Sequence, residues 1–186
     1  EVERMQAPVK EAMDQGAVGI STGLIYRPGI SAKTDEVLEL VKVVAPYGGI
    51  YHSHIRNERD KLLEAVGEAI AIAEGAGVRA NISHFKVMRK ANWGLVGEAS
   101  QMIEAARARG LRITADQYPY RFSNTVPYSP LVPREVWTGE GGGVGTADIR
   151  KAFSRLRDVE LMELYAKATP FVPLSRPHLD FLAGLP

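Results

Sequence analysis

Four glycines recur at a spacing of about 30 residues through the first two thirds of the chain. They are Gly16, Gly49, Gly77 and Gly110, which lie 33, 28 and 33 residues apart. Each follows an amphipathic helical pattern and precedes a short apolar run with β propensity. Strands that alternate with helices at this spacing are joined by crossovers into a parallel sheet. The spacing therefore predicts an α/β fold of about four βα units over residues 1–118.

The apolar residues between these glycines predict the individual elements. Helices are expected over 2–15 and 97–109, and two others lie between them, one from Thr34 and one in the segment after residue 60. Thr34 is the expected N-cap of its helix because acidic residues follow in the first turn. Strands are expected over 17–22, 50–55, 78–85 and 111–117.

Two architectures fit four such units: an open doubly wound sheet, or part of a (β/α)8 TIM-like barrel. No glycine-rich phosphate loop follows any expected strand, which disfavours a nucleotide-binding open sheet. Polar residues instead collect at the carboxyl ends of the strands, where barrel enzymes build their active sites. These residues are Ser21, Thr22, His52, His54, His84, Lys86, Asp116 and Tyr118.

The character of the chain changes after Tyr118. Eight of the eleven prolines fall from Pro119 onward, and residues 140–145 form a glycine-rich run typical of a flexible link. Short helices are plausible here, but no further strand is evident. We therefore expect an inserted, mostly helical or irregular lid-like subdomain and a tail over residues 119–186.

The overall composition excludes several classes of function. A net charge of +1 gives no electrostatic reason to bind nucleic acid or an anionic membrane. The absence of cysteine excludes a thiolate nucleophile or a cysteine zinc site within this chain. No apolar run reaches the roughly 20 residues that a membrane span needs, and we expect a cytoplasmic protein. The sequence starts at Glu1 without an initiator Met, which suggests that it begins inside a larger gene product.

Two histidines at the ends of neighbouring strands are the strongest candidates for chemistry. Side chains alternate along a strand, so His52 and His54 point the same way, and His84 and Lys86 share a face with Ile82. Imidazoles at the ends of adjacent parallel strands come within reach of one metal ion, and zinc favours imidazole nitrogen. Paired strand histidines are more often packed or hydrogen-bonded, so the spacing alone leaves both readings open.

Other polar residues near the same edge have two readings each. Arg56 and Lys86 could bind a substrate carboxylate, or Arg56 could lie in a solvated loop. Asp116 could orient a ligand histidine from behind, or cap a helix. The aromatic rings of Tyr26 and Tyr118 could line a substrate pocket or cover the core.

Several long motifs narrow these alternatives. They are Gly16-Ala-Val-Gly-Ile-Ser-Thr-Gly-Leu-Ile-Tyr26, Tyr47-Gly-Gly-Ile-Tyr51, His54-Ile-Arg56, Leu62-Leu-Glu-Ala-Val66, Ile82-Ser-His-Phe-Lys86, Ala91-Asn-Trp-Gly94 and Ala115-Asp-Gln-Tyr-Pro-Tyr120. Taken in order over about residues 10–125, they resemble the N-acyl-D-amino-acid deacylase (D-aminoacylase) family of the amidohydrolase superfamily.

The resemblance implies a distorted barrel that holds zinc and hydrolyses the amide bond of N-acyl-D-amino acids, giving a free D-amino acid and a carboxylate. His54 and His84 match the two metal-binding histidines of consecutive strands. The resemblance also implies that a further set of residues contacts the small-molecule substrate. We add Arg56 to this set because its charge could bind a substrate carboxylate. At His52 the resemblance implies a small or apolar residue instead. The expected contacts are Lys86, Tyr118 and Ser123 for the carboxylate or acyl group, and Ile25 and Tyr26 for the side-chain pocket.

Three parts of the family pattern are missing from the sequence. They are an early His-x-His pair, a cysteine metal ligand and the aspartate general acid/base. We therefore expect a fragment that cannot complete the reaction alone. The alternative is a non-catalytic module, or a fragment of a degenerate amidohydrolase, that self-associates through exposed sheet edges. A cyclic-amide hydrolase is disfavoured because no lysine ends the Gly-Ile-Ser-Thr-Gly strand.

Overall fold

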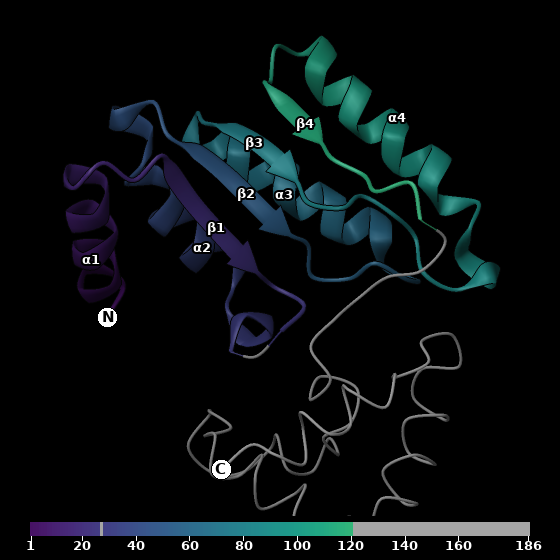
Figure 1. The fold of residues 1–186 in the computed structure, drawn as a ribbon, viewed down its shortest axis with the longest axis horizontal. Coiled ribbons are helices and arrows are strands. Elements are labelled where there is room, and N and C mark those ends of the chain that lie inside the picture. Colours follow the sequence, from purple (N-terminus) through teal and green to yellow (C-terminus); the bar gives the residue numbers. More distant parts are fainter. Residues whose placement is uncertain (27, 121–186) are drawn as a thin grey trace, which may run out of the picture. The chain divides into compact units, whose positions relative to one another are not determined.

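The computed structural model describes residues 1–26 and 28–120, which form one parallel β-sheet with helices packed on one of its faces (Figure 1). The sheet has the order β1-β2-β3-β4, so each strand lies beside the next one in the chain. The strands are β1 (Gly19–Gly23), β2 (Ile50–His54), β3 (Arg79–Ile82) and β4 (Ile113–Ala115). All three strand pairs are parallel, as the predicted α/β class requires.

A helix precedes each strand, and the helices between strands return the chain to the edge of the sheet where the next parallel strand begins. These helices are α1 (Val2–Asp14), α2 (Thr34–Lys42), α3 (Leu62–Ala76) and α4 (Leu95–Ala108). Short 3₁₀ turns lie at Gly29–Ser31, Ala45–Tyr47 and Lys90–Asn92. The four predicted βα units are therefore present in the predicted order. No helix of the described residues is both long and apolar enough to cross a membrane.

The core lies between the sheet and the helices. In β2, Tyr51 and Ser53 are fully buried, whereas His52 and His54 on the opposite face are half-buried. Among the described helices, α3 contributes the most buried residues, because residues such as Leu62 and Val66 recur at helical spacing along its sheet-facing side. One sheet face is therefore packed, while the face that carries the histidines bears no helix of the described residues, and we call it the open face.

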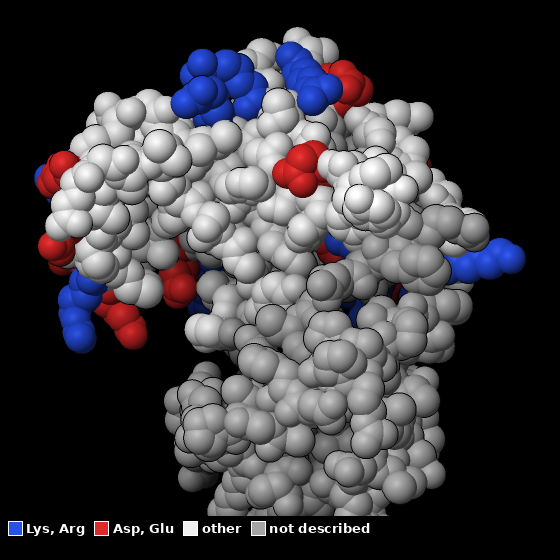
Figure 2. Space-filling view, in the orientation of Figure 1, with Lys and Arg blue, Asp and Glu red and all other residues white. Residues whose placement is uncertain are grey.

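The open face of the sheet is turned toward the viewer in Figure 1. In the same orientation, Figure 2 shows most Lys, Arg, Asp and Glu side chains toward the margin of the described part, and an acidic side chain lies within its otherwise mainly uncharged middle. The half-buried histidines of β2 belong to this open face.

The turn glycines differ from the prediction at one position. Gly16, Gly77 and Gly110 adopt the left-handed φ expected after a helix, but in the second unit this role falls to Gly48, with φ of 65°. Gly49 is needed for a different reason. A Cβ there would lie 3.0 Å from both Cβ and the carbonyl oxygen of Val44.

Two predicted details of the elements are wrong. Thr34 is the first residue of α2 and not its N-cap, and its hydroxyl donates to Oε1 of Glu68 at 2.8 Å. Strand β3 ends at Ile82, three residues early, because His84 adopts a φ of 38° that breaks the extended backbone. Ile82 therefore lies in the core, while His84 turns toward the open face and does not share a face with it.

The chain divides into two units, Glu1–Tyr118 and Pro119–Pro186. All the elements above belong to the first unit. The predicted lid-like subdomain and tail fall, apart from residues 119 and 120, outside the described residues, as does the predicted substrate contact Ser123.

Candidate metal centre

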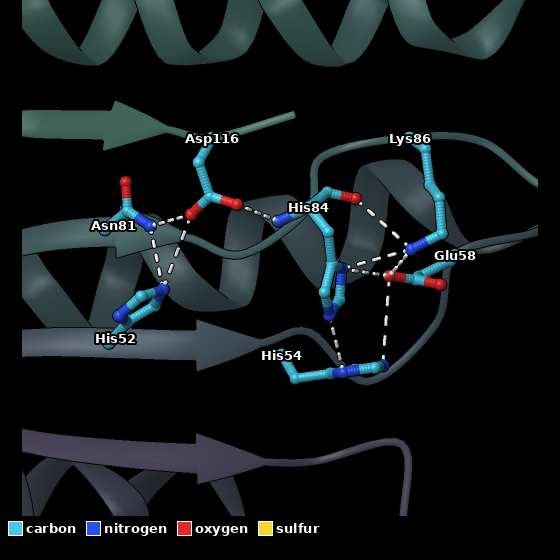
Figure 3. A network of polar contacts seen from close by, with 7 residues as sticks. All are labelled: His52, His54, Glu58, Asn81, His84, Lys86 and Asp116. Atoms are coloured by element: carbon cyan, nitrogen blue, oxygen red, sulfur yellow. Dashed lines mark hydrogen bonds and ion pairs between the residues drawn. The ribbon is translucent and has the colours of Figure 1, made fainter. Parts of the chain in front are cut away.

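The carboxyl ends of β2 and β3 bring His54, Glu58 and His84 together (Figure 3). His54 is the last residue of β2, Glu58 follows in the loop to α3, and His84 lies in the loop after β3. Parallel strands end at the same edge of a sheet, so loops that follow neighbouring strands meet there. The predicted pair of histidines is thus brought together, and a carboxylate joins it.

The two imidazoles face each other. Nδ1 of His54 lies 2.8 Å from Nε2 of His84, and the rings meet edge to face with their centroids 4.2 Å apart. Each ring also presents its other nitrogen toward Glu58 (Figure 3). The arrangement places four imidazole nitrogens and one carboxylate within a small polar cluster.

Glu58 is the buried charge of this cluster. Its side chain is 4% exposed, and Oε1 lies 2.6 Å from Nζ of Lys86, 2.9 Å from Nδ1 of His84 and 3.8 Å from Nε2 of His54. A buried carboxylate requires a compensating cation and hydrogen-bond donors. Lys86 supplies the cation, and it also donates to the carbonyl oxygen of His84 at 3.2 Å.

Burial keeps His54 neutral. Desolvation lowers the pKa of His54 to about 4, the charges of His84 and Lys86 lower it further, and the nearby Glu58 opposes them. A neutral imidazole offers a lone pair on one nitrogen, which is the form that ligates metals. His54 is therefore in the ligating form at neutral pH.

The donor set fits a zinc ion. One ligand atom from each of His54, Glu58 and His84 lies within 4.8 Å of the other two. Imidazole nitrogen and carboxylate oxygen are both zinc ligands. Within the described residues, Nε2 of His54 is the buried side-chain nitrogen or oxygen that makes no hydrogen bond. This nitrogen lies 3.8 Å from Oε1 of Glu58, so the zinc assignment rests on the types of ligand in the cluster and on their closeness.

A second polar network borders the histidines and contains Asp116. One of its carboxylate oxygens accepts the backbone N–H of His84 at 2.7 Å, and the other accepts from Nδ2 of Asn81 at 2.5 Å. Burial alone would raise the pKa of Asp116, but these hydrogen bonds and the nearby histidines lower it below the usual value. Asp116 thus holds the backbone of His84, while the carboxylate beside the ring is Glu58. His52 belongs to this network, because its Nε2 lies 2.8 Å from Nδ2 of Asn81 and 3.5 Å from Asp116.

Three residues expected to contact substrate lie around the same centre. The ring of Tyr26 lies 4.8 Å from that of His54, between centroids, and Nζ of Lys86 lies 5.6 Å from the ring centre of Tyr118. Ile25 precedes Tyr26 in the loop after β1 and is half-buried. The structure places Tyr26, Lys86 and Tyr118 near the histidines, and their contact with a substrate stays a prediction.

Arg56 is engaged within the protein. Arginine has five N–H donors, and each of those of Arg56 has a partner. Nε and one N–H of Nη2 bind the two carboxylate oxygens of Glu68 at 2.9 and 2.8 Å, and the others bind the carbonyls of Gly29, Ile30 and Ala32. Burial opposes the ionised form of Glu68, but the hydrogen bonds from Arg56 and Thr34 lower its pKa. Arg56 therefore fastens the loop after β1 to helix α3.

Sequence reasoning missed Glu58. The residue lies in a run of charged residues, 56–60, that is typical of a solvated loop. The position four residues after His54 carries no periodicity, because the strand has ended. Only the folded loop shows that this one carboxylate points inward while Arg59 and Asp60 stay exposed.

Comparisons with known proteins agree with the motifs. No protein-family model matches the chain. Three curated proteins of Alcaligenes xylosoxydans xylosoxydans are similar over 122 to 126 residues: N-acyl-D-glutamate deacylase at 41% identity, D-aminoacylase at 39% and N-acyl-D-aspartate deacylase at 35%. The matches cover 66–68% of this chain and 24–26% of each relative. The chain thus spans about a quarter of the length of these curated relatives.

Solved structures give the same result. A crystal structure of D-aminoacylase, described as a novel subset of amidohydrolases, superimposes with a TM-score of 0.62 at 39% identity, over 64% of this chain and 25% of that one. An N-acyl-D-glutamate deacylase from Bordetella bronchiseptica, solved with zinc and a phosphonate inhibitor, superimposes with a TM-score of 0.66 at 29% identity. That match covers 88% of this chain and 40% of the neighbour. In sequence and in fold, the chain is therefore similar to a segment of the D-aminoacylases, which are amidohydrolases, as its motifs predicted.

Proposed function

We propose that the chain supplies metal-binding and substrate-binding residues to an N-acyl-D-amino-acid deacylase. The observation that carries this proposal is the pair of facing imidazoles, 2.8 Å apart, in a chain that is 35–41% identical to three such deacylases. The reaction is hydrolysis of the amide bond of an N-acyl-D-amino acid, which yields the free D-amino acid and a carboxylate.

His54 and His84 would hold the zinc ion. When bound, zinc supplies a Lewis acid and lowers the pKa of a bound water toward neutrality. The task of the chain is to present both rings with a lone pair available. Burial keeps His54 neutral, and Asp116 fixes the backbone of His84 through its N–H.

Lys86 would bind the carboxylate of the substrate. Its ammonium lies at the metal centre, over the ring of Tyr118, and is 16% exposed. The ion pair with Glu58 orients this ammonium, which donates to Glu58 and to the carbonyl oxygen of His84 and has a third N–H for a substrate carboxylate. Tyr118 would contact the same end of the substrate.

Ile25 and Tyr26 would line the pocket for the substrate side chain. Arg56 was predicted to contact the substrate directly, but all five of its donors bind Glu68 and the carbonyls of residues 29, 30 and 32. We therefore propose that Arg56 acts indirectly, by holding the loop that carries Ile25 and Tyr26.

The general acid/base is expected to be an aspartate outside this chain, as the family resemblance implies. We accordingly expect the 186-residue chain alone not to turn substrate over. The three relatives are named for D-glutamate, D-aspartate and D-amino acids in general, at similar identities, so we propose only the class of substrate.

A chimaera tests this function. The matching segment of the Alcaligenes D-aminoacylase would be replaced by residues 1–120 of this chain, and hydrolysis of an N-acetyl-D-amino acid would be followed by release of the free D-amino acid. We expect hydrolysis that is lost on His84→Ala and retained on His52→Ala. A folded, zinc-loaded chimaera that fails to hydrolyse, or that is indifferent to His84→Ala, would contradict the proposal.

A further inference from the structure

We propose that Glu58 is a positioning residue: one buried oxygen, Oε1, orients both predicted metal ligands and the predicted substrate-binding lysine. The inference rests on the proposed function for the roles of His54, His84 and Lys86. It goes beyond that function by assigning the residue that sets their orientation and the protonated nitrogen of each ring.

The burial of Glu58 shows that its contacts are specific. The residue is 3% exposed, although it lies in a loop between strand and helix. Its backbone carbonyl also accepts the N–H of Met88 at 2.6 Å, which joins the loop after β2 to the loop after β3. The carboxylate is therefore fixed relative to both loops that carry the histidines.

The distances assign a role to each imidazole nitrogen. Nδ1 of His84 lies 2.9 Å from Oε1 of Glu58, so this nitrogen donates its N–H to the carboxylate. A neutral imidazole carries one N–H, and Nε2 of His84 then presents a lone pair. Nε2 is the nitrogen that faces His54 (Figure 3). The hydrogen bond to Glu58 thus directs the lone pair of His84 toward its partner ring.

The same logic applies more weakly to His54. Its Nε2 lies 3.8 Å from Oε1 of Glu58, which is too long for a hydrogen bond but close enough for the carboxylate to favour a proton there. Without metal, the 2.8 Å contact between Nδ1 of His54 and Nε2 of His84 is a hydrogen bond, so Nδ1 of His54 carries the proton and donates it to the lone pair of His84. A metal bound between the rings would displace this proton, and the carboxylate of Glu58 would favour its return on Nε2 of His54, so that both facing nitrogens ligate.

Lys86 shares the same oxygen. Its Nζ lies 2.6 Å from Oε1 and 3.0 Å from Nδ1 of His84, so two donors meet at one acceptor. The carboxylate therefore fixes the distance between the ammonium and the metal-binding ring. The substrate carboxylate and the metal must be held at a set separation. Glu58 contacts both the lysine proposed to bind the carboxylate and the histidine proposed to bind the metal.

A direct metal–Glu58 bond is the competing arrangement. It would use Nδ1 of His84 and Nε2 of His54, the nitrogens nearest Oε1. It would also take Oε1 from Lys86, for which Glu58 is the only carboxylate partner within the described residues. The geometry instead satisfies Lys86, His84 and Glu58 together and leaves the facing nitrogens to ligate.

Nuclear magnetic resonance of the imidazole nitrogens tests the proposal on the purified 186-residue chain. The ¹⁵N shifts and two-bond couplings of His84 are recorded without zinc and with one equivalent of zinc. We expect the proton of His84 on Nδ1 in both states. A proton on Nε2 in the zinc-loaded chain would show ligation through Nδ1 and overturn the proposal. If zinc fails to bind at all, the proposed function fails, while the zinc-free spectrum still decides the role of Glu58.

Substitution supplies the second arm of the test. Glu58→Ala and Glu58→Gln are compared with Glu64→Ala, a matched control whose side chain is 74% exposed at the start of α3. We expect Glu58→Ala to weaken zinc binding by about tenfold to a hundredfold, as measured by competition with a chelator, and to shift the proton of His84 from Nδ1 toward Nε2. The Glu64→Ala control should change neither. An unchanged zinc affinity and an unchanged tautomer in a folded Glu58→Ala chain would overturn the proposal.

Discussion

Nδ1 of His54 and Nε2 of His84 lie 2.8 Å apart across two strand ends that are 30 residues apart in the chain. The register of β2 and β3 brings the strand ends together, since His52 pairs with Asn81 and Ser53 with Ile82. The final approach of the two rings depends on the local backbone, because His84 follows the strand with a left-handed φ of 38°. The contact therefore depends on what holds the backbone of His84.

Asp116 is expected to be that anchor. It accepts the N–H of His84 at 2.7 Å, and Asp116→Ala removes this hydrogen bond without touching either imidazole. We expect a fall in zinc affinity of about tenfold, as for other residues that support metal ligands. Chelator competition measures the change, with Asp35→Ala, an exposed residue of α2, as the control. Equal affinities for both variants would show that Asp116 does not anchor His84.

Arg56 is expected to stabilise the fold. Arg56→Lys keeps the charge but loses the planar guanidinium group. That group binds Glu68 through two nitrogens and also donates to three backbone carbonyls. We expect a loss of about 1–3 kcal/mol in the free energy of unfolding, measured by urea denaturation. The exposed pair Lys42–Glu39 provides the control, and Lys42→Ala should cost less than about 1 kcal/mol. An Arg56→Lys variant as stable as the wild type would contradict the role of Arg56 in holding the loop.

The lowered pKa of Glu68 predicts how the free energy of unfolding changes at acidic pH. The pKa of Glu68 is lower in the folded chain than the ordinary value of 4.5 for a glutamate. Below pH 4.5 the unfolded chain therefore takes up the proton first, and stability falls as the pH drops toward the folded pKa. Glu68→Gln removes this titration, so its stability should fall less steeply than that of the wild type over the same range. Parallel pH profiles of the two chains would contradict the assignment.

The edges of the sheet predict self-association. Within the described residues, β1 pairs only with β2 and β4 only with β3, so each has one edge without a strand partner. Unpaired edges favour pairing between chains. We expect the solution mass to rise above that of one chain as concentration increases, and Ser21→Lys on β1 to reduce this rise relative to Ser100→Lys on α4. A single-chain mass at every concentration, measured by light scattering, would contradict this expectation.

The four βα units could be predicted from the sequence because their signals are local. Helix-ending glycines such as Gly77 and apolar faces such as that of α3 specify each element within a few residues. The pairing of His54 with His84 followed from a general property, that parallel strands end at one edge. Residue type and strand spacing therefore nominate the histidines at this edge, and the family motifs select His54 and His84 among them.

Other features depend on contacts that no local pattern records. Glu58 is buried because two loops close over it, and its neighbours in the sequence are exposed charges. The early end of β3 comes from the φ of His84, a histidine in a conformation more common for glycine. The partners of Arg56 lie in a loop about 25 residues earlier and a helix 12 residues later.

Zinc titration of the purified 186-residue chain tests the central claim most directly. The account predicts one zinc per chain, with an affinity that falls by at least about a hundredfold on His54→Ala or His84→Ala. His52→Ala serves as the matched control, since it lies on the same strand and face but binds Asn81, and its affinity should stay within a few fold of the wild type. Failure of the wild-type chain to bind zinc, or binding that survives both substitutions, would contradict the account.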